Sequence, residues 1–588
     1  MVNRAVAMTL LLAASLVLTG DRALAERQPV SSGGATAAPH TVADAARWRF
    51  LDQHWDAATR ERFWFTSQGS RLIPYRWFLA LEQADELKTF RSDAHMEALR
   101  FIPAPRTARN PDALPVGFVK DEGDGDWAGL TCAACHTAQI DYKGTSLIID
   151  GGPAMGNIDR LFVELAAALR MTAADPAKLR RFADKVIGAG QPQGERDQLL
   201  RRVREESARL DARWKANTAN PPAGISKDYP GYARIDAYGQ IYNQVTALDL
   251  GVPENAKFPN APASYPYLWG TPQSDVVQWN GAGQNRFPNE NFPIGVLVRN
   301  AIEAMGVFGR TDMSAGLGVY PSSVDLANLG RLEQPLCRLH APKWPSDVFG
   351  APDANLVAEG KQVYDAHCIT CHARVDDEQK YEVEGKLKPI EEVQTDPNLA
   401  VNAAQREVLT GRLDKRPKRP GGEPFGPKAY AHEVLANAVG GVVLAKLLPA
   451  FDGIAWSACA TPPDKMTDVE RVQQVQDALA ELLPKLDVMP LKYKPRPLNG
   501  IWATAPYLHN GSIPSLAELL KAPADRVKKF YVGTREFDPV LVGFRTDPGP
   551  DTTEFDTSLD GNHNTGHGWV ADLTDQQRRQ LLEYLKTL

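Results

Sequence analysis

The stretch EGKQVYDAHCITCH, residues 359–372, holds two cysteines that are separated by two residues and followed directly by a histidine. The same pattern occurs earlier, in GLTCAACHTAQIDYKG, residues 129–144. Thiols at this spacing can add to the two vinyl groups of one haem, and the adjacent histidine can then ligate the iron. The sequence therefore predicts two covalently bound haem c groups. The expected anchors and iron ligands are Cys132, Cys135 and His136 for one group, and Cys368, Cys371 and His372 for the other.

Two other kinds of site use pairs of cysteines with this spacing. Two such pairs could supply four thiolates to a structural zinc ion, and a single pair could act as a redox dithiol. Neither reading explains why a histidine follows the second cysteine directly in both copies. We therefore prefer haem attachment to zinc binding or dithiol chemistry.

The two motifs lie too far apart in the chain for one small module, so each is expected in a domain of its own. With 588 residues, the chain is long enough for two large domains. We expect an N-terminal haem domain with insertions at residues 46–345 and a C-terminal cytochrome c-like haem domain at residues 346–588, joined by the proline-rich stretch 335–355. The expected fold class is mainly α, with two cytochrome c-like haem domains, long insertions and loops, and few short strands.

Three stretches have the pattern of helices. Apolar residues recur at helical intervals in residues 158–171, and the charged stretch 197–214 also predicts a helix. Near the C-terminus, Thr574 and Gln577 form a candidate capping box before an amphipathic helix. This last helix and the segment before Cys368 resemble the two terminal helices that pack across each other in c-type cytochrome domains.

The N-terminus has the features of an export signal. A short basic start, an apolar run and a small-residue cleavage site predict a signal peptide at residues 1–25, followed by a flexible segment at 26–45. The protein is therefore expected in the periplasm or secreted, without a membrane span once the signal is removed. A net charge of −6 is slight for this length and argues against nucleic acid as a partner.

Two further cysteines, Cys337 and Cys459, belong to neither motif. In an oxidising compartment they could form a disulfide, and two buried free thiols are the alternative. The sequence leaves both readings open.

The sixth ligand of each iron decides whether a haem transfers electrons or binds a small molecule. Methionine or histidine closes the iron, whereas an open face can bind oxygen or peroxide. Only two methionines, Met466 and Met489, follow the second motif. The histidines beyond it are His432, His509, His563 and His567.

One late segment resembles a known group of proteins. The stretch PLNGIWATAPYLHNGSIPSL, residues 497–516, is similar to the PYxHDG-type segment of bacterial dihaem cytochrome c peroxidases. It resembles more closely their relatives, the dihaem rubber oxygenases and the sequence-related dihaem fatty-acid dioxygenases. Further similar stretches are residues 68–83, 264–281 and 561–569.

The resemblance bears on the second iron. In the peroxidases a methionine located after this segment usually ligates the C-terminal haem, and this chain has no methionine there. The resemblance to rubber oxygenases implies two histidine ligands instead, and His567 is our choice for the distal one. His509 is the rival and is better suited to a hydrogen bond near a haem propionate. Tyr531 and Met489 remain as alternatives.

For the first haem the resemblance implies an open distal face where oxygen binds. Residues 276–309 are expected to form a wall of that pocket. Trp279 is the candidate aromatic residue near the bound oxygen, Ile294 the candidate apolar residue over the iron, and Glu303 a candidate acid/base group. Core packing is the alternative for Trp279 and Ile294, and a helix-surface charge is the alternative for Glu303.

These observations lead to one expected function and two alternatives. We expect a periplasmic dihaem oxidoreductase that activates oxygen, in the manner of a dioxygenase, at the first haem on an apolar unsaturated substrate, while the second haem stores or transfers an electron. The alternatives are a hydrogen peroxide-reducing cytochrome c peroxidase supplied by a small redox protein, and an electron-transfer cytochrome without catalysis. A calcium ion between the haems is a further candidate cofactor.

Overall fold

The computed structural model describes residues 48–588, apart from 227, 315–317, 377, 384–385 and 460–465. The predicted signal peptide at 1–25 and the predicted flexible segment at 26–45 both lie outside the described residues. Within the described part, the chain is mainly helical with short strands and no closed sheet, which confirms the predicted fold class at that level.

The helices differ widely in length, and the longest is α7. In chain order they are α2 (Ala57–Phe65), α3 (Tyr75–Ala80), α4 (Asp93–Ala98), α5 (Ile158–Ala174), α6 (Pro176–Val186), α7 (Gln193–Asn217), α8 (Ala237–Tyr242), α9 (Ile294–Gly306), α10 (Leu326–Glu333), α11 (Ser346–Phe349), α12 (Ala354–His367), α13 (Ile390–Val393), α14 (Asn398–Gln405), α15 (Ala431–Leu444), α16 (Leu447–Ser457), α17 (Asp468–Leu482), α18 (Leu516–Leu519) and α19 (Asp575–Leu585).

The strands form small sheets of two or three members. They are β1 (Trp48–Phe50), β2 (Ile73–Pro74), β3 (Phe118–Asp121), β4 (Trp127–Leu130), β5 (Thr137–Tyr142), β6 (Thr145–Asp150), β7 (Arg234–Ile235), β8 (Ala263–Ser264), β9 (Val276–Val277), β10 (Gly283–Gln284), β11 (Arg374–Val375), β12 (Tyr381–Val383), β13 (Lys388–Pro389), β14 (Glu407–Leu409), β15 (Lys428–Tyr430), β16 (Lys492–Tyr493), β17 (Lys529–Val532), β18 (Phe537–Asp538), β19 (Gly543–Phe544) and β20 (Thr553–Asp556). The two three-stranded sheets have the orders β1-β6-β5 and β2-β4-β3.

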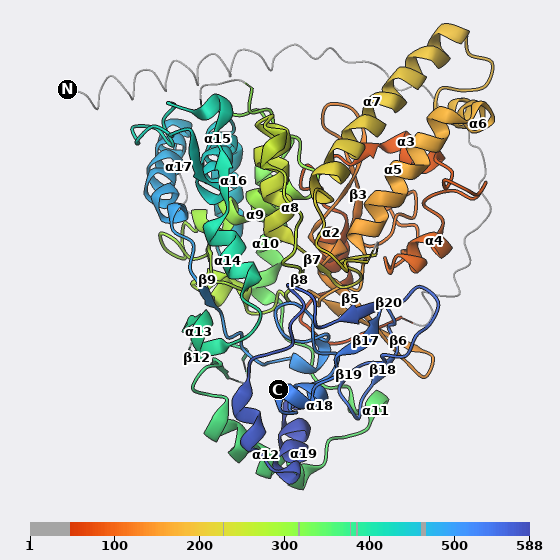
Figure 1. Cartoon of the computed structure of the whole chain (residues 1–588). Coiled ribbons are helices and arrows are strands. Elements are labelled where there is room, and N and C mark those ends of the chain that lie inside the picture. Colours follow the sequence, from red (N-terminus) through yellow and green to blue (C-terminus); the bar gives the residue numbers. More distant parts are fainter. Residues whose placement is uncertain (1–47, 227, 315–317, 377, 384–385, 460–465) are drawn as a thin grey trace.

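Three large apolar cores organise the helices. One lies around α3, α5, α6 and α7, a second around α9, α10, α15, α16 and α17, and the third includes α12 and α19 (Figure 1). The predicted helices at 158–171 and 197–214 are confirmed as α5 and α7. Both bury one face because their apolar residues recur every three or four positions, as Leu199, Val203 and Leu210 do on α7.

Helices α12 and α19 correspond to the two terminal helices expected from the resemblance to c-type cytochrome domains. Thr574 caps α19 and exchanges hydrogen bonds with Gln577, which confirms the predicted capping box. The two helices touch at Gly360, where an added Cβ would lie 2.0 Å from the carbonyl oxygen of Gln580. Cys368 follows α12 directly, so this packing positions the second motif.

The apolar cores do not divide at residue 345. The second core joins residues 241–329 with residues 408–486, and the third also takes residues from both sides of 345. The stretch 335–355 is itself packed, with Leu336 and Leu339 buried. The boundary expected at 345/346 is therefore not a boundary between cores, because helices from each half need the other half to cover their apolar faces.

Cys337 and Cys459 form a disulfide in this structure, with 5.6 Å between their Cα atoms. The bond links the packed stretch after α10 to the end of α16. The disulfide reading of the sequence is therefore confirmed over the reading of two free thiols.

Among the described residues, no single helix is long and apolar enough to cross a membrane. The bent pair α15 and α16 passes the same test together, with an angle of 101° between its halves. Most residues of α15 are buried in the second core.

Candidate haem sites

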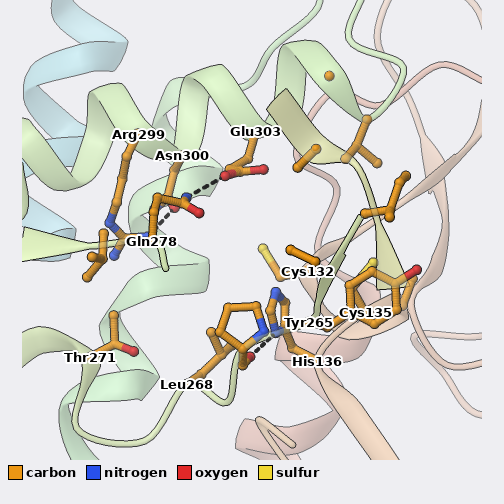
Figure 2. Close-up of a pocket in the computed structure, with 18 of the residues that line it drawn as sticks. Cys132, Cys135, His136, Tyr265, Leu268, Thr271, Gln278, Arg299, Asn300 and Glu303 are labelled. Carbon is orange, nitrogen blue, oxygen red and sulfur yellow. Dashed lines mark hydrogen bonds between the residues drawn. The ribbon is translucent and has the colours of Figure 1, made fainter. Parts of the chain in front are cut away.

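The first motif lies between two strands rather than at the end of a helix. Cys132 begins a single 3-10 turn between β4 and β5, and the Thr131 side chain caps this turn by accepting the N–H of Ala133. The carbonyl of Cys132 then accepts the N–H groups of both Cys135 and His136. This compact turn brings both thiols and the imidazole to one cavity (Figure 2).

The orientation of His136 leaves one ring nitrogen available to a metal. Its Nδ1–H donates to the carbonyl oxygen of Pro266 at 2.8 Å, so Nε2 carries no proton. Metal-binding histidines commonly have this arrangement, in which a backbone carbonyl fixes the ring. Burial lowers the pKa of His136 to about 4, which keeps the imidazole in the neutral form that binds a metal.

The cysteines do not have the properties of a redox dithiol. Burial raises the pKa values of Cys132, Cys135 and Cys368 to about 12, whereas reactive thiols have lowered pKa values. A shared zinc site is not supported either. Within the described ranges, no group of three or more His, Cys, Asp or Glu side chains is arranged to hold a metal ion.

Helix α9 supplies polar residues to the first cavity, across from the motif. Figure 2 shows Arg299, Asn300 and Glu303 on this side together with Gln278. Gln278 Nε2 donates to Glu303 Oε1 at 2.6 Å. Burial raises the pKa of Glu303, while the Gln278 hydrogen bond and the Arg299 charge act in the opposite direction. Glu303 is therefore a candidate proton carrier at the cavity and not a helix-surface charge.

Sequence reasoning missed the residues that form the cavity wall together with Glu303. Arg299 donates to Glu333 Oε1 at 2.6 Å, and Asn300 donates to Glu333 Oε2 at 3.1 Å. Arg299 and Asn300 precede Glu303 by four and three positions, which places all three on one helix face. This spacing could have indicated from the sequence that Arg299 and Asn300 share the helix face of Glu303. Gln278 comes from a separate loop, and the sequence contained no sign of its contact with Glu303.

The other two predicted residues of this pocket differ in their position. Trp279 lines the cavity, and its indole N–H donates to the carbonyl of Ser264 at 2.9 Å. Ile294 does not line it and is fully buried in the second apolar core. It precedes Glu303 by nine residues, or two and a half helical turns, and so faces the opposite side of α9. The placement of Ile294 over the iron is therefore corrected to core packing.

The second motif repeats the proximal arrangement in a different local fold. Cys368 is the C-cap residue directly after α12, and His372 follows in the next turn. His372 Nδ1–H donates to the carbonyl oxygen of Arg496 at 2.7 Å, which again leaves Nε2 for a metal. Burial lowers the pKa of His372. The cavity beside it has a volume of about 620 Å³, which is within the usual range for bound ligands.

His567 faces His372 across this second cavity. The two ring centroids are 6.4 Å apart and the ring planes differ by 21°. His567 has a left-handed backbone with φ 52°, next to Gly566 with φ 87°. Its Nδ1 is buried without a hydrogen-bond partner among the described residues, and burial lowers its pKa to about 3.

Arg526 supports the loop that carries His567. Its Nη1 donates to the carbonyls of Asn564 and Gly566 at 2.6 and 3.0 Å. Its Nη2 and Nε donate to the carbonyls of Leu519 and Lys521. The buried guanidinium of Arg526 therefore fixes two backbone carbonyls of the segment just before His567. Arg526 had no recognisable signal in the sequence.

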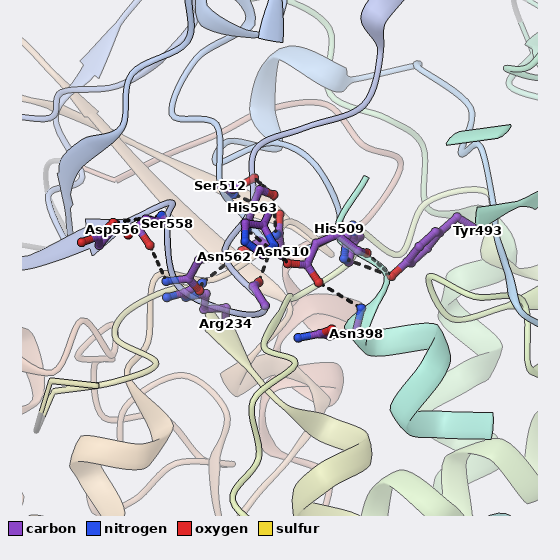
Figure 3. Close-up of polar contacts among 12 residues, drawn as sticks. Arg234, Asn398, Tyr493, His509, Asn510, Ser512, Asp556, Ser558, Asn562 and His563 are labelled. Carbon is purple, nitrogen blue, oxygen red and sulfur yellow. Dashed lines mark hydrogen bonds and ion pairs between the residues drawn. The ribbon is translucent and has the colours of Figure 1, made fainter. Parts of the chain in front are cut away.

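His509 lies in the wall of the same cavity but has another partner. Its Nε2 is 3.3 Å from the hydroxyl of Tyr493, which donates to the carbonyl of Asp396 at 2.6 Å (Figure 3). His563 binds the buried Asp396 carboxylate through Nδ1 at 2.8 Å. Met489 lines a small cavity on the α9 side and not the second haem cavity.

The chain is similar in sequence to a known protein family and to known proteins. Residues 492–531, which include Arg496 and His509, match the family described as RoxA-like, cytochrome c-like. The protein y4iJ of Sinorhizobium fredii strain NGR234, described as uncharacterized, is 30% identical over 93% of this chain and 94% of its own length. The chain belongs to the family of this y4iJ protein.

A second relative from the same strain is more distant. The y4iM protein, also described as uncharacterized, is 25% identical over 61% of this chain and 72% of its own length. The matched segment supports a cytochrome c of the RoxA-like type for this member of the y4iJ family, and a cytochrome c-like domain implies covalently bound haem c. It also indicates a haem-containing oxidoreductase.

The residues at the second cavity fit a haem. With a metal–nitrogen bond of about 2 Å and about 1.1 Å from nitrogen to ring centre, two imidazoles on one metal have centroids about 6.2 Å apart. The His372 and His567 centroids are 6.4 Å apart, and the buried Nδ1 of His567 has no hydrogen-bond partner among the described residues. Cys368 and Cys371 line the same cavity.

The residues at the first cavity also fit a haem, with a different set of candidate ligands. Its volume of about 220 Å³ is far larger than one water molecule needs. Cys132, Cys135 and His136 line it, and among its described lining residues His136 is the only histidine and there is no methionine. The two cavities thus offer one imidazole and two facing imidazoles, respectively.

Proposed function

We propose that this protein is a dihaem oxidoreductase that activates dioxygen at the His136 site to cleave or oxygenate an apolar unsaturated substrate. The observation that carries the proposal is the difference between the two cavities: among the described residues that line the first cavity, His136 is the only histidine, whereas His372 faces His567 across the second. A haem with one side-chain ligand can bind a small oxidant, and one with two histidines transfers or stores electrons.

The chain's own groups at the first site support this chemistry. Burial raises the pKa of Glu303, which favours the protonated carboxyl group, so Glu303 can serve as the group that passes a proton to a reacting oxygen. Gln278 fixes the orientation of its carboxyl group. Arg299 is held by Glu333 and adds a positive charge to the same wall. These groups bind, orient and exchange protons, while the haem supplies the redox chemistry.

The proposed substrate class rests on the rest of the lining. Apolar side chains, among them Leu329, Leu332 and Phe308, line much of the first cavity. Such a surface favours an apolar ligand by removing its carbon chain from water. We extend the proposal to an unsaturated hydrocarbon or fatty acid, and to a periplasmic or secreted location as the N-terminal sequence predicts.

A hydrogen peroxide-reducing peroxidase is the second candidate. The observation that favours it is Glu303, because a distal carboxylate can move protons during cleavage of an O–O bond. In that case a small redox protein would supply electrons through the second haem. The peroxidase and oxygenase proposals share the same two haem sites and differ only in the oxidant and substrate.

The test uses the purified holo-protein. Electronic and EPR spectra should contain one high-spin haem and one low-spin haem with two histidines. Oxygen uptake is then measured with oleate and with polyisoprene latex, and hydrogen peroxide turnover is measured with a reduced small cytochrome. Oxygen uptake that depends on one of the two substrates supports the oxygenase. Peroxide turnover alone would replace it with the peroxidase. If both haems have two side-chain ligands as isolated and after reduction, both enzymes are excluded.

A further inference from the structure

The two haem cavities share one wall. Pro266, Tyr267, Trp279, Lys494 and Arg496 line both. Besides Trp279, this wall is made by two short segments, residues 264–267 and residues 494–497. The two segments are far apart in the sequence. Each segment contains the carbonyl that anchors one proximal histidine, Pro266 for His136 and Arg496 for His372.

Arg496 joins these two anchors directly. Its Nη2 donates to the carbonyl of Tyr267 at 2.5 Å, and Tyr267 is the next residue after Pro266. Its own carbonyl accepts the Nδ1–H of His372 at 2.7 Å. Three hydrogen bonds, the Pro266–Tyr267 backbone and the Arg496 residue therefore connect the His136 ring to the His372 ring.

The connection is held in more than one way. The guanidinium carbon of Arg496 lies 3.9 Å from the centre of the Tyr267 ring, within the range of a cation–π contact. The Tyr267 hydroxyl donates to the carbonyl of Pro497, the residue after Arg496. Tyr267 and Pro497 are buried. Closely packed groups of this kind move together, so a shift of one segment is passed to the other.

We propose that Arg496 couples the two haem sites, so that a change in ligation at the His136 site alters the ligand field of the His372–His567 site. A displacement of the His136 imidazole pulls on the Pro266–Tyr267 peptide through its Nδ1–H bond. Arg496 passes this displacement to its own carbonyl, which sets the position of His372. Arg496 is a positioning residue, and the inference rests on the proposed pair of haem sites. Coupling of this kind is reciprocal.

The experiment measures how ligation at the first haem affects the second. The midpoint potential of the low-spin haem is determined by spectroelectrochemical titration of the holo-protein, without and with imidazole. Imidazole is neutral, so its binding to the open first haem adds no charge. In the wild-type protein the midpoint potential of the second haem is expected to shift when imidazole binds.

Two variants distinguish the hydrogen-bonded connection through Arg496 from the effect of positive charge on the shared wall. Arg496→Lys keeps the positive charge but loses the fork that reaches the Tyr267 carbonyl, and the imidazole-dependent shift is expected to be lost. Lys494→Gln removes a positive charge from the same wall, where Lys494 donates to the Val276 carbonyl at 2.6 Å. It should change the resting potentials and keep the imidazole-dependent shift. Tyr267→Leu removes the ring under the guanidinium and the hydroxyl that donates to the Pro497 carbonyl. It serves if Arg496→Lys does not fold, and it should reduce the shift.

The outcomes distinguish this proposal from the proposed function. A wild-type protein with one high-spin and one low-spin haem but no imidazole-dependent shift would overturn the coupling alone. An undiminished shift in Arg496→Lys, or equal loss of the shift in Lys494→Gln, would also overturn it. A wild-type protein whose first haem is already closed by two side chains would overturn both proposals.

Discussion

At the scale of single residues, backbone carbonyls decide how the haem-site histidines point. Pro266 and Arg496 each accept the Nδ1–H of a proximal histidine that lies more than a hundred positions away. His567 has no such acceptor among the described residues, and its position depends on the backbone and on Arg526. Its ring is therefore the least restrained of the three.

Replacing His567 with alanine tests its place opposite His372. Because the facing imidazole is 6.4 Å from His372, its loss should open one axial position and convert the low-spin signal of the second haem to high spin. EPR of the holo-protein measures this change. His563→Ala is the matched control, since His563 binds the Asp396 carboxylate instead. A low-spin signal that survives His567→Ala would contradict the assignment.

Asp249 makes a separate contribution to pH dependence. Burial raises the pKa of Asp249 to about 7, above its ordinary value of 3.8, although Gln244 and Arg213 favour the charged form. The folded protein therefore holds a proton there that the unfolded chain releases. Between about pH 4 and pH 7, the free energy of unfolding should fall as pH rises, by up to about 1.4 kcal/mol per pH unit from this group.

The prediction is checked by urea unfolding of the wild-type protein and Asp249→Asn at several pH values. The asparagine variant should lose this part of the slope, because it does not titrate, and should keep its hydrogen bond to Gln244. Equal slopes for the two proteins over this range would show that Asp249 is not protonated in the folded state.

At the scale of elements, the two motifs use different supports for the same chemistry. The second follows α12, which crosses α19 as the sequence predicts. The first lies on a 3-10 turn between β4 and β5. Helix α9 divides its residues by face, with Glu303 at the cavity and Ile294 in the core. The spacing of residues on a helix predicts which ones share a face, but not which face meets the haem site.

Gly360→Ala tests the α12–α19 crossing. The added methyl group would lie 2.0 Å from the Gln580 carbonyl oxygen, so the helices must separate. Overpacking of this kind should lower the free energy of unfolding by about 1–3 kcal/mol. Gly194→Ala in α7 is the control, because a Cβ there meets nothing within 4 Å. It should be neutral or stabilising by up to about 1 kcal/mol. Thermal unfolding followed by circular dichroism compares them, and equal midpoints would contradict the close crossing.

At the scale of the whole molecule, the two halves of the sequence are packed into common cores. The second and third cores both contain residues from either side of position 345. The wall between the haem cavities is likewise made from residues 264–267 and 494–497. The two candidate haem sites are therefore parts of one packed structure, and the relation between them depends on contacts between distant segments.

The Cys337–Cys459 disulfide adds a covalent link across position 345, at a sequence separation of 122 residues. Removing it in Cys337→Ala/Cys459→Ala should lower the free energy of unfolding by about 2–4 kcal/mol, chiefly because the unfolded chain gains freedom. Urea unfolding under non-reducing conditions measures the difference. Addition of a reductant should destabilise the wild-type protein and leave the double variant unchanged. Equal stability of both proteins before reduction would contradict a structural role for the bond.

The sequence by itself predicted the candidate haem anchors and proximal histidines, and it determined the mainly helical class, the helices α5, α7 and α19, and the capping box at Thr574. Each depends on residues close together in the chain, where spacing limits the geometry. Only the tertiary structure decided that His567 faces His372, that Ile294 lies in the core, and that Arg496 and Arg526 hold the haem-site segments. These contacts join residues far apart in the sequence, and they exist only once the apolar cores bring those segments together.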